Sequence, residues 1–131
     1  MGQPAAKKGD QVTATDIHIE MIPSPGGPIP TPLPNTFMGQ LDGDLSSDVN
    51  IEGQPAAVVG STATNMPAHI PKSGPFQKPP ADKGKVLLGS ATVMINGKQA
   101  ARNGDKVMTC NDPADIPAGS IIAVGQVMIG G

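Results

Sequence analysis

A short motif occurs three times along this chain of 131 residues, and it constrains the fold more than any other feature. Residues 2–10, 53–61 and 97–105 share a glycine, an Ala-Ala pair and a second glycine at the same internal spacing. Self-similarity of this kind is typical of architectures in which one supersecondary unit recurs. We therefore expect a single domain over residues 1–131, built from three versions of one unit that begin near residues 2, 49 and 93.

Strand-like sequences precede the second and third copies of the motif. Residues 49–53 and 93–97 alternate in the manner of a β-strand and then run into a turn, for which Asn96-Gly97 is a strong type I′ signal. The first copy has no strand before it, but residues 127–131 repeat the same Val-x-Ile-x-Gly pattern. We expect the C-terminal strand, within 120–131, to complete the first repeat. That closure would give pseudo-threefold symmetry and bring the two chain ends together.

Glycine and proline recur at turn positions, and no stretch shows a helical period, so the expected fold class is all-β. Strands are expected near the following ranges: 17–22, 48–52, 56–60, 86–95, 98–103 and 120–129. Two proline-rich segments separate the repeats. Residues 23–34 should be extended or polyproline-like and unable to join a central strand, and residues 71–85 should form a solvated loop.

The hydrophobic core must be thin, because the chain has no Trp or Tyr and only two aromatic residues, Phe37 and Phe76. Small scaffolds with thin cores commonly need a disulfide, a metal or a partner to stabilise them. Cys110 is the only cysteine, so no intramolecular disulfide can form. The stabilising element, if the chain has one, is therefore a metal ion or an assembly partner.

The charge balance argues against nucleic acid as a partner, and the hydropathy argues against a signal peptide and a membrane-spanning segment. Nine Lys and Arg residues against eleven Asp and Glu residues leave no net positive field for nucleic acid. The N-terminus lacks the apolar stretch of a secretory signal, and no run approaches the roughly 18 apolar residues that span a bilayer. We expect export, if it occurs, to use a route without a signal peptide.

Three residues are placed by the repeat as candidate metal ligands. His18 and His69 each lie nine residues after the second glycine of their motif, and Cys110 lies six residues after that of the third. Taken singly, two histidines and a cysteine are ordinary core or surface residues, but threefold folding would bring these three onto one axis. Imidazole nitrogens and a thiolate favour tetrahedral zinc, and a structural site would want a fourth ligand.

Catalysis is not indicated by the sequence. It contains no phosphate-binding glycine loop and no Gly-x-Ser-x-Gly nucleophile turn. Cys110 could in principle pair with either histidine as a nucleophile and base, but such a site also needs a pocket and an orienting group. Asp10, Ser61 and Asp105 follow the motif glycines, where they should accept hydrogen bonds from turn amides. We therefore expect that this protein is not an enzyme.

The repeated Pro-Ala-Ala-x-x-Gly-Asp element, with Val-Met-Ile-Asn-Gly before its third copy, resembles the PAAR repeat, named for Pro-Ala-Ala-Arg. Arg102 is the arginine of the third copy, and proline stands only in the first two, as Pro4 and Pro55, so the chain is similar to divergent PAAR-like proteins. Residues 89–97 are the nearest stretch to the family pattern, whereas the two long segments between repeats match poorly.

The resemblance implies a small conical domain of three β repeats with long Pro/Gly-rich loops. Its base would sit on a trimeric VgrG-like spike, one cap per trimer, in a contractile injection machine. Type VI secretion systems, extracellular injection particles and phage tails all fit. The cap would be assembled in the bacterial cytoplasm, sharpen the spike and meet the target membrane on firing, with effector attachment as a further role. A cargo adaptor working through segments 23–34 and 71–85, and a metal-dependent hydrolase, are the alternatives.

The resemblance also implies a structural zinc ion near the apex, held by His18, His69 and Cys110. The family commonly has a third histidine, which this chain lacks. Asp16, Asp112 and water are therefore the candidates for the fourth position. No toxin domain is appended within these 131 residues, so we expect a stand-alone tip.

Overall fold

The computed structural model describes residues 2–130, which form β-strands, turns and connecting segments without a helix. Over these residues, therefore, no helix is available that could cross a membrane. The strands are β1 (Gln3–Pro4), β2 (Gln11–Ile22), β3 (Ile29–Gly43), β4 (Asn50–Ile51), β5 (Gln54–Pro55), β6 (Thr62–Asn65), β7 (Lys83–Val86), β8 (Met94–Ile95), β9 (Lys98–Gln99), β10 (Lys106–Thr109), β11 (Ile116–Ile122) and β12 (Met128–Ile129). The expected all-β class is confirmed.

Six strands close into an antiparallel barrel in the order β10-β11-β2-β3-β6-β7. The order is cyclic, so the strand pairs β2–β3, β6–β7 and β10–β11 follow one another around the barrel. Alternate residues along a strand point to opposite faces, and the inward set forms a compact apolar core that includes Val12, Phe37, Leu41, Val86 and Val107. No pattern in the sequence indicates this barrel.

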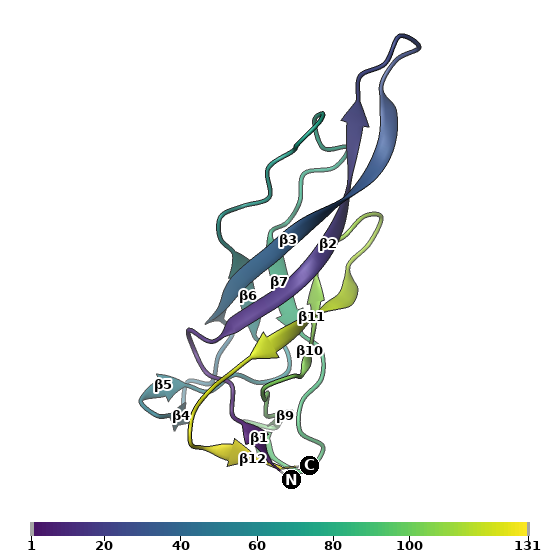
Figure 1. The fold of residues 1–131 in the computed structure, drawn as a ribbon. Helices are drawn as coiled ribbons and strands as arrows, with labels where there is room; N and C mark the ends of the chain where they lie inside the picture. The colour runs from purple at the N-terminus through teal and green to yellow at the C-terminus, as the bar shows by residue number, and fades with distance from the viewer. Residues whose placement is uncertain (1, 131) are drawn as a thin grey trace.

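Three two-stranded sheets, β1–β12, β4–β5 and β8–β9, lie beyond one end of the barrel, where both chain ends also lie (Figure 1). Strand β12 pairs with β1, with Ile129 opposite Gln3, so the expected meeting of the two chain ends is confirmed. The expected range of that strand, 120–131, ends at Gly131, which lies outside the described residues. Each of these sheets contributes one buried isoleucine to a second, smaller core; these are Ile51, Ile95 and Ile129.

The turn after each Ala-Ala pair is closed by a side chain. Asp10 accepts the backbone N–H of Lys7 at 3.0 Å, Ser61 accepts that of Val58 at 3.0 Å, and Asp105 accepts that of Arg102 at 2.8 Å. The glycine before each acceptor has a left-handed backbone, with φ of 92° at Gly9, 98° at Gly60 and 86° at Gly104. Because a Cβ disfavours that conformation, glycine is the residue that fits. The expected turn role of the three polar residues is confirmed.

The second alanines of the three motifs hydrogen bond to one another in a closed cycle. Ala57 donates to the carbonyl of Ala6, Ala6 to that of Ala101, and Ala101 to that of Ala57, each at 3.0 Å. All three are fully buried. The side chains here must therefore be small, because three backbones meet at one point.

The proline-rich segment is the main difference from the sequence-based expectation, because residues 29–34 are the first half of strand β3 and not a loop. Pro30, Pro32 and Pro34 lie opposite Met21, Ile19 and Ile17 of β2. Those three β2 residues donate their N–H groups on the side away from β3, to the 75–77 segment and to two side chains near residue 111. The prolines thus occupy register positions at which β2 offers no donor toward β3, along a stretch that has a ladder partner on one side only.

Other expected boundaries also change. The strand expected over 120–129 is two strands, β11 and β12, and β2 begins at Gln11 instead of near residue 17. The expected strands at 48–52 and 98–103 are reduced to the two-residue strands β4 and β9, and the range 86–95 holds only the last residue of β7 and the strand β8. The range 56–60 contains no strand, only isolated bridges at Ala56 and Val58, while β6 and β10 were missed. The loop expected at 71–85 includes the first three residues of β7, and its Phe76 bridges to Glu20.

Candidate metal centre

Four side chains from three different strand pairs of the barrel meet in its interior. Asp16 and His18 come from β2, His69 from the segment after β6, and Cys110 from the residue after β10. One potential ligand atom from each lies within 4.8 Å of all the others. Asp16, His18 and Cys110 are buried, and the His69 side chain is 3% exposed. The fold thus brings together the three predicted residues and one of the candidates for the fourth.

Strand alternation explains how β2 supplies two of the four. Asp16, His18 and Glu20 occupy every second position and all point inward, continuing the apolar row that begins at Val12. Polar side chains thus replace apolar ones in the barrel interior as β2 runs away from the chain ends. Buried polar groups of this kind need partners, and the cluster supplies them.

The short distances within the cluster lie close to those between the donors of a tetrahedral zinc site. His69 Nε2 lies 3.0 Å from Asp16 Oδ2, Cys110 Sγ lies 3.5 Å from the same oxygen, and Cys110 Sγ lies 3.6 Å from His18 Nε2. Zinc bonds of about 2.0–2.3 Å place neighbouring donors of a tetrahedron roughly 3.3–3.8 Å apart. Two imidazoles, a thiol and a carboxylate are also donors that zinc accepts.

Asp16 is oriented by the segment that carries Cys110. Its Oδ1 atom accepts a hydrogen bond from Thr109 Oγ1 at 2.5 Å and a longer one from Asn111 Nδ2 at 3.3 Å. These bonds leave Oδ2 directed at His69 and Cys110. A ligating carboxylate is normally held in this way by outer hydrogen bonds.

His18 is backed by a second carboxylate, that of Asp112. The His18 Nδ1 atom lies 3.6 Å from Asp112 Oδ2, and it makes no hydrogen bond with any described residue. A carboxylate behind a histidine fixes the ring so that its other nitrogen faces the metal. Asp112, the other carboxylate considered for the fourth position, therefore lies behind the site, and its Oδ2 accepts the N–H of Ile19 at 2.9 Å.

His69 is held in a different hydrogen-bonding state. Asn65 Oδ1 accepts the N–H of Met38, and Asn65 Nδ2 donates to Asp82, so the amide faces His69 Nδ1 with its N–H at 3.2 Å. Nδ1 then accepts, and Nε2 carries the proton that it donates to Asp16. Ligation through Nε2 would require the ring proton to leave this nitrogen.

Burial raises the pKa of the Cys110 thiol to about 12, and the nearby Asp16 carboxylate adds to the effect. The backbone amides of Asp82 and Lys83 act in the opposite direction but are weaker. A zinc ion binds the thiolate, so it would displace this proton.

The Cys110 thiol should therefore react slowly in the folded chain. Its pKa rises from 9.0 to about 12, which reduces the thiolate at pH 8 by about a thousandfold. We expect iodoacetamide to alkylate the folded chain at least about 100-fold more slowly than the chain in urea, as measured by mass spectrometry. Equal rates in the two states would show that Cys110 is accessible.

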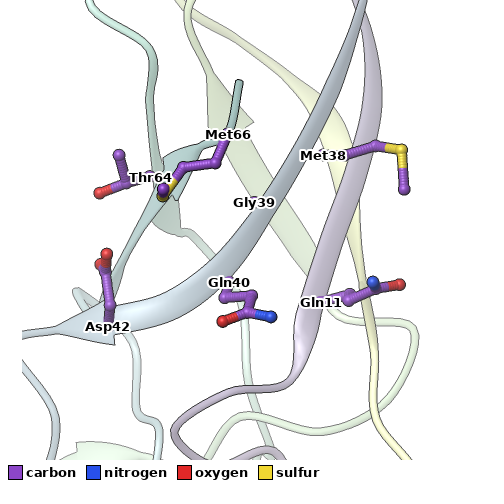
Figure 2. A pocket seen from close by; sticks show the side chains of 7 residues that line it. All are labelled: Gln11, Met38, Gly39, Gln40, Asp42, Thr64 and Met66. Atoms are coloured by element: carbon purple, nitrogen blue, oxygen red, sulfur yellow. The ribbon is translucent and has the colours of Figure 1, made fainter. Parts of the chain in front are cut away.

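The outer surface carries a pocket that is separate from this cluster. It has a volume of about 260 Å³ and is lined by residues of β2, β3 and β6 together with Met66 (Figure 2). None of the four cluster side chains lines it. A second pocket, of about 370 Å³, is lined by His69 together with Asn65, so only Asp16, His18 and Cys110 lie away from both pockets.

Sequence reasoning missed the supporting residues of the site. Asn65, Thr109 and Asn111 are buried and polar, and each contacts Asp16 or His69. Glu20 was also missed. An alternation of ionisable residues, Asp-x-His-x-Glu over 16–20, is the one signal that could have indicated a polar interior on this strand.

Comparison with known protein families matches residues 76–131 to the PAAR motif. This stretch contains Cys110 and the third Ala-Ala element, together with β12, which pairs with β1. A comparison with curated proteins matched none. A PAAR motif implies a spike-tip protein of secretion systems, the kind that sits on VgrG spikes, and it suggests a structural protein rather than an enzyme. Residues 76–131 of this chain are therefore similar to the PAAR motif.

Proposed function

We propose that this protein is the structural tip that caps and sharpens the trimeric spike of a bacterial contractile injection machine. The observation that carries the proposal is the PAAR motif over residues 76–131, on a fold whose three Ala-Ala elements meet in one hydrogen-bonded cycle. The cap is assembled on the spike in the cytoplasm and leaves with it when the machine fires.

Matching hydrogen bonds support a pseudo-threefold base. The first alanine of each pair donates its N–H to the carbonyl of the valine that begins the β-hairpin of the same repeat: Ala5 to Val127, Ala56 to Val49 and Ala100 to Val93. The turn glycines donate in the same way to Leu41, Val86 and Ile121 of the barrel. One chain of residues 1–131 thus forms a single domain that offers three similar surfaces to three identical spike chains.

The end of the molecule opposite the chain termini supports the proposed role as a pointed tip. Strands β2 and β3 continue past the rest of the barrel and end in a turn far from the chain termini (Figure 1). Prolines frame that turn, and Gly27 donates its N–H to Ser24 at 3.0 Å. A narrow hairpin of this kind concentrates force on a target envelope.

We further propose that Asp16, His18, His69 and Cys110 bind a structural zinc ion. When bound, zinc would tie together segments that are far apart in sequence and stabilise the fold directly. A catalytic zinc keeps one position for water, whereas these four donors complete a tetrahedron. The proposed centre is therefore structural, and hydrolysis is disfavoured.

The test is assembly with a VgrG-type trimer encoded in the same genome. We expect one cap per three spike chains, measured by native mass spectrometry of the co-purified complex. The base offers matched positions for variants, since the residue before the buried isoleucine is Asn50, Met94 or Met128 and all three are exposed. Met94→Asp and Met128→Asp should weaken capture at least about tenfold, because an apolar contact is replaced by a charge that must be desolvated. Asn50→Asp, a polar-to-charged change, should have the smallest effect.

Three caps per trimer, or a wild-type chain that captures no spike, would contradict the proposed function. Equal binding by all three variants would instead show that these hairpins lie outside the interface.

A further inference from the structure

Glu20 is a fully buried carboxylate that takes no part in the candidate metal cluster. It lies on β2 two residues after His18 and points into the same interior. Its Oε1 atom accepts three consecutive backbone N–H groups, from Lys72 at 3.0 Å, Ser73 at 2.7 Å and Gly74 at 3.1 Å. Successive amides that converge on one point form an anion-binding nest, and here the anion is a side chain of the protein itself.

The nest offsets the cost of burying this charge. Burial by itself would raise the pKa of Glu20, but the amides of Ser73, Lys72 and Gly74 outweigh it and the pKa lies below its ordinary value. The other oxygen, Oε2, makes no hydrogen bond to the described part of the chain. All the protein contacts of this carboxylate are therefore directed at one loop.

The loop held by Glu20 is the one that carries His69. Beyond the nest, Met21 donates its N–H to Pro75 at 2.7 Å and Gln77 donates to Ile19 at 2.8 Å, so residues 75–77 lie along β2 with an isolated antiparallel bridge between Phe76 and Glu20. A Cβ added to Gly74 would lie 2.1 Å from the Met21 carbonyl oxygen, so only glycine permits this approach.

The same loop also touches the ligand set at two points. His69 Nε2 reaches Asp16, and the ring of Phe76 lies edge-on to that of His18 with centroids 5.8 Å apart. Between these two contacts, the loop is attached to β2 by the Glu20 nest and by the Met21–Pro75 hydrogen bond. Loss of the nest would remove the side-chain part of this attachment and loosen the loop on the strand that supplies Asp16 and His18, while the backbone N–H of His69 stays bound to Asp82.

We propose that Glu20 is a positioning residue for the metal centre, which fixes the 69–76 loop on β2 so that His69 is held in place before the metal binds. The inference rests on the proposed zinc site. A ligand that is already ordered adds affinity, because binding does not have to immobilise it.

The substitution Glu20→Gln tests this with little change of shape. The amide keeps one oxygen for the nest but removes the negative charge that strengthens the three hydrogen bonds. We expect zinc affinity, measured by competition with a chromophoric chelator, to fall by about 10–100-fold, the usual effect of an outer-shell change. Amide hydrogen exchange at residues 72–74 of the zinc-loaded chain should become faster.

Asp105→Asn is the matched control. It makes the same carboxylate-to-amide change at a buried turn of the third repeat, where Asp105 binds Arg102. It should lower the melting temperature and leave the zinc dissociation constant within about twofold of the wild type. Substitution by Co²⁺ gives a second readout, because the visible spectrum should change in Glu20→Gln if His69 no longer ligates, and stay unchanged in Asp105→Asn.

Two results would overturn the inference. One is a Glu20→Gln chain with wild-type zinc affinity and cobalt spectrum; the other is equal weakening by both substitutions, which would indicate general destabilisation. A wild-type chain that binds neither zinc nor cobalt would instead remove the proposed metal centre, and with it the role of Glu20.

Discussion

Chelation of the proposed zinc ion is expected to lower the melting temperature of this protein by more than about 15 °C. The four donors come from three strand pairs and lie up to 94 residues apart in the chain, as Asp16 and Cys110 do. A metal that joins such segments adds folding free energy on the order of several kcal/mol, and each kcal/mol moves the midpoint by roughly 3–5 °C at this size. Cys110→Ser and the His18→Ala, His69→Ala double variant should show the same loss without chelator.

Elemental analysis of the natively purified chain and thermal denaturation measure the two halves of this prediction. We expect about one zinc per wild-type chain and much less in the variants. Lys85→Ala is the control, since Lys85 lies on β7 with its side chain exposed, and it should change neither quantity. Less than about one metal ion per ten wild-type chains, together with a midpoint that chelation does not move, would mean that the cluster is a hydrogen-bonded core.

The three repeats could be predicted from the sequence because each depends on residues that lie close together in the chain. Each needs a left-handed glycine, a small pair of residues and a side-chain acceptor within ten residues, so the turns at Gly9, Gly60 and Gly104 could be located from the sequence. The barrel could not be predicted from the sequence in the same way. Its strands pair across long separations, and β6 and β10 are only four residues each, too short for a period to stand out.

For the proline-rich half of β3, which is extended as expected, residue type alone could not predict that the segment joins a strand. Proline removes a hydrogen-bond donor, which excludes it from a central strand but not from a stretch with a ladder partner on one side. Whether residues 29–34 meet that condition depends on register. Pro32 opposite Ile19 is compatible because the carbonyl of Ile19 already accepts the N–H of Gln77 and needs no donor from β3. That hydrogen bond can be identified only from the tertiary structure.

Some residues of the candidate site could likewise be predicted from the sequence, and others could not. His18, His69 and Cys110 could be selected because their types are rare in this chain and their positions follow the repeat. Asp16 could be named only as an alternative to Asp112 and water, because both carboxylates are close to a ligand in sequence. Their roles follow from geometry, since Asp16 faces Cys110 while Asp112 lies behind His18. Glu20 and Asn65 contact the segment that carries His69, and no local sequence pattern indicates these contacts.

Enlarging one alanine of the central cycle is expected to have the second-largest effect on stability. Ala6, Ala57 and Ala101 are each 0% exposed, and their backbones are joined by three hydrogen bonds of 3.0 Å. A leucine at any of these positions must push the other two chains apart. Overpacking typically costs about 1–3 kcal/mol, and each backbone bond that is lost adds roughly 0.5–1.5 kcal/mol.

For Ala57→Leu we therefore expect a loss of about 3 kcal/mol or more and a midpoint about 10 °C lower, measured by thermal and urea denaturation. Lys8→Leu places the same side chain two residues after Ala6, at an exposed position of the first repeat, and should change the midpoint by no more than about 2 °C. Because the three alanines close one cycle, Ala6→Leu and Ala101→Leu should cost about as much as Ala57→Leu. If one of them were tolerated like Lys8→Leu, the three motifs would not share a common packing point, and the base would lack the threefold character on which binding to a trimer depends.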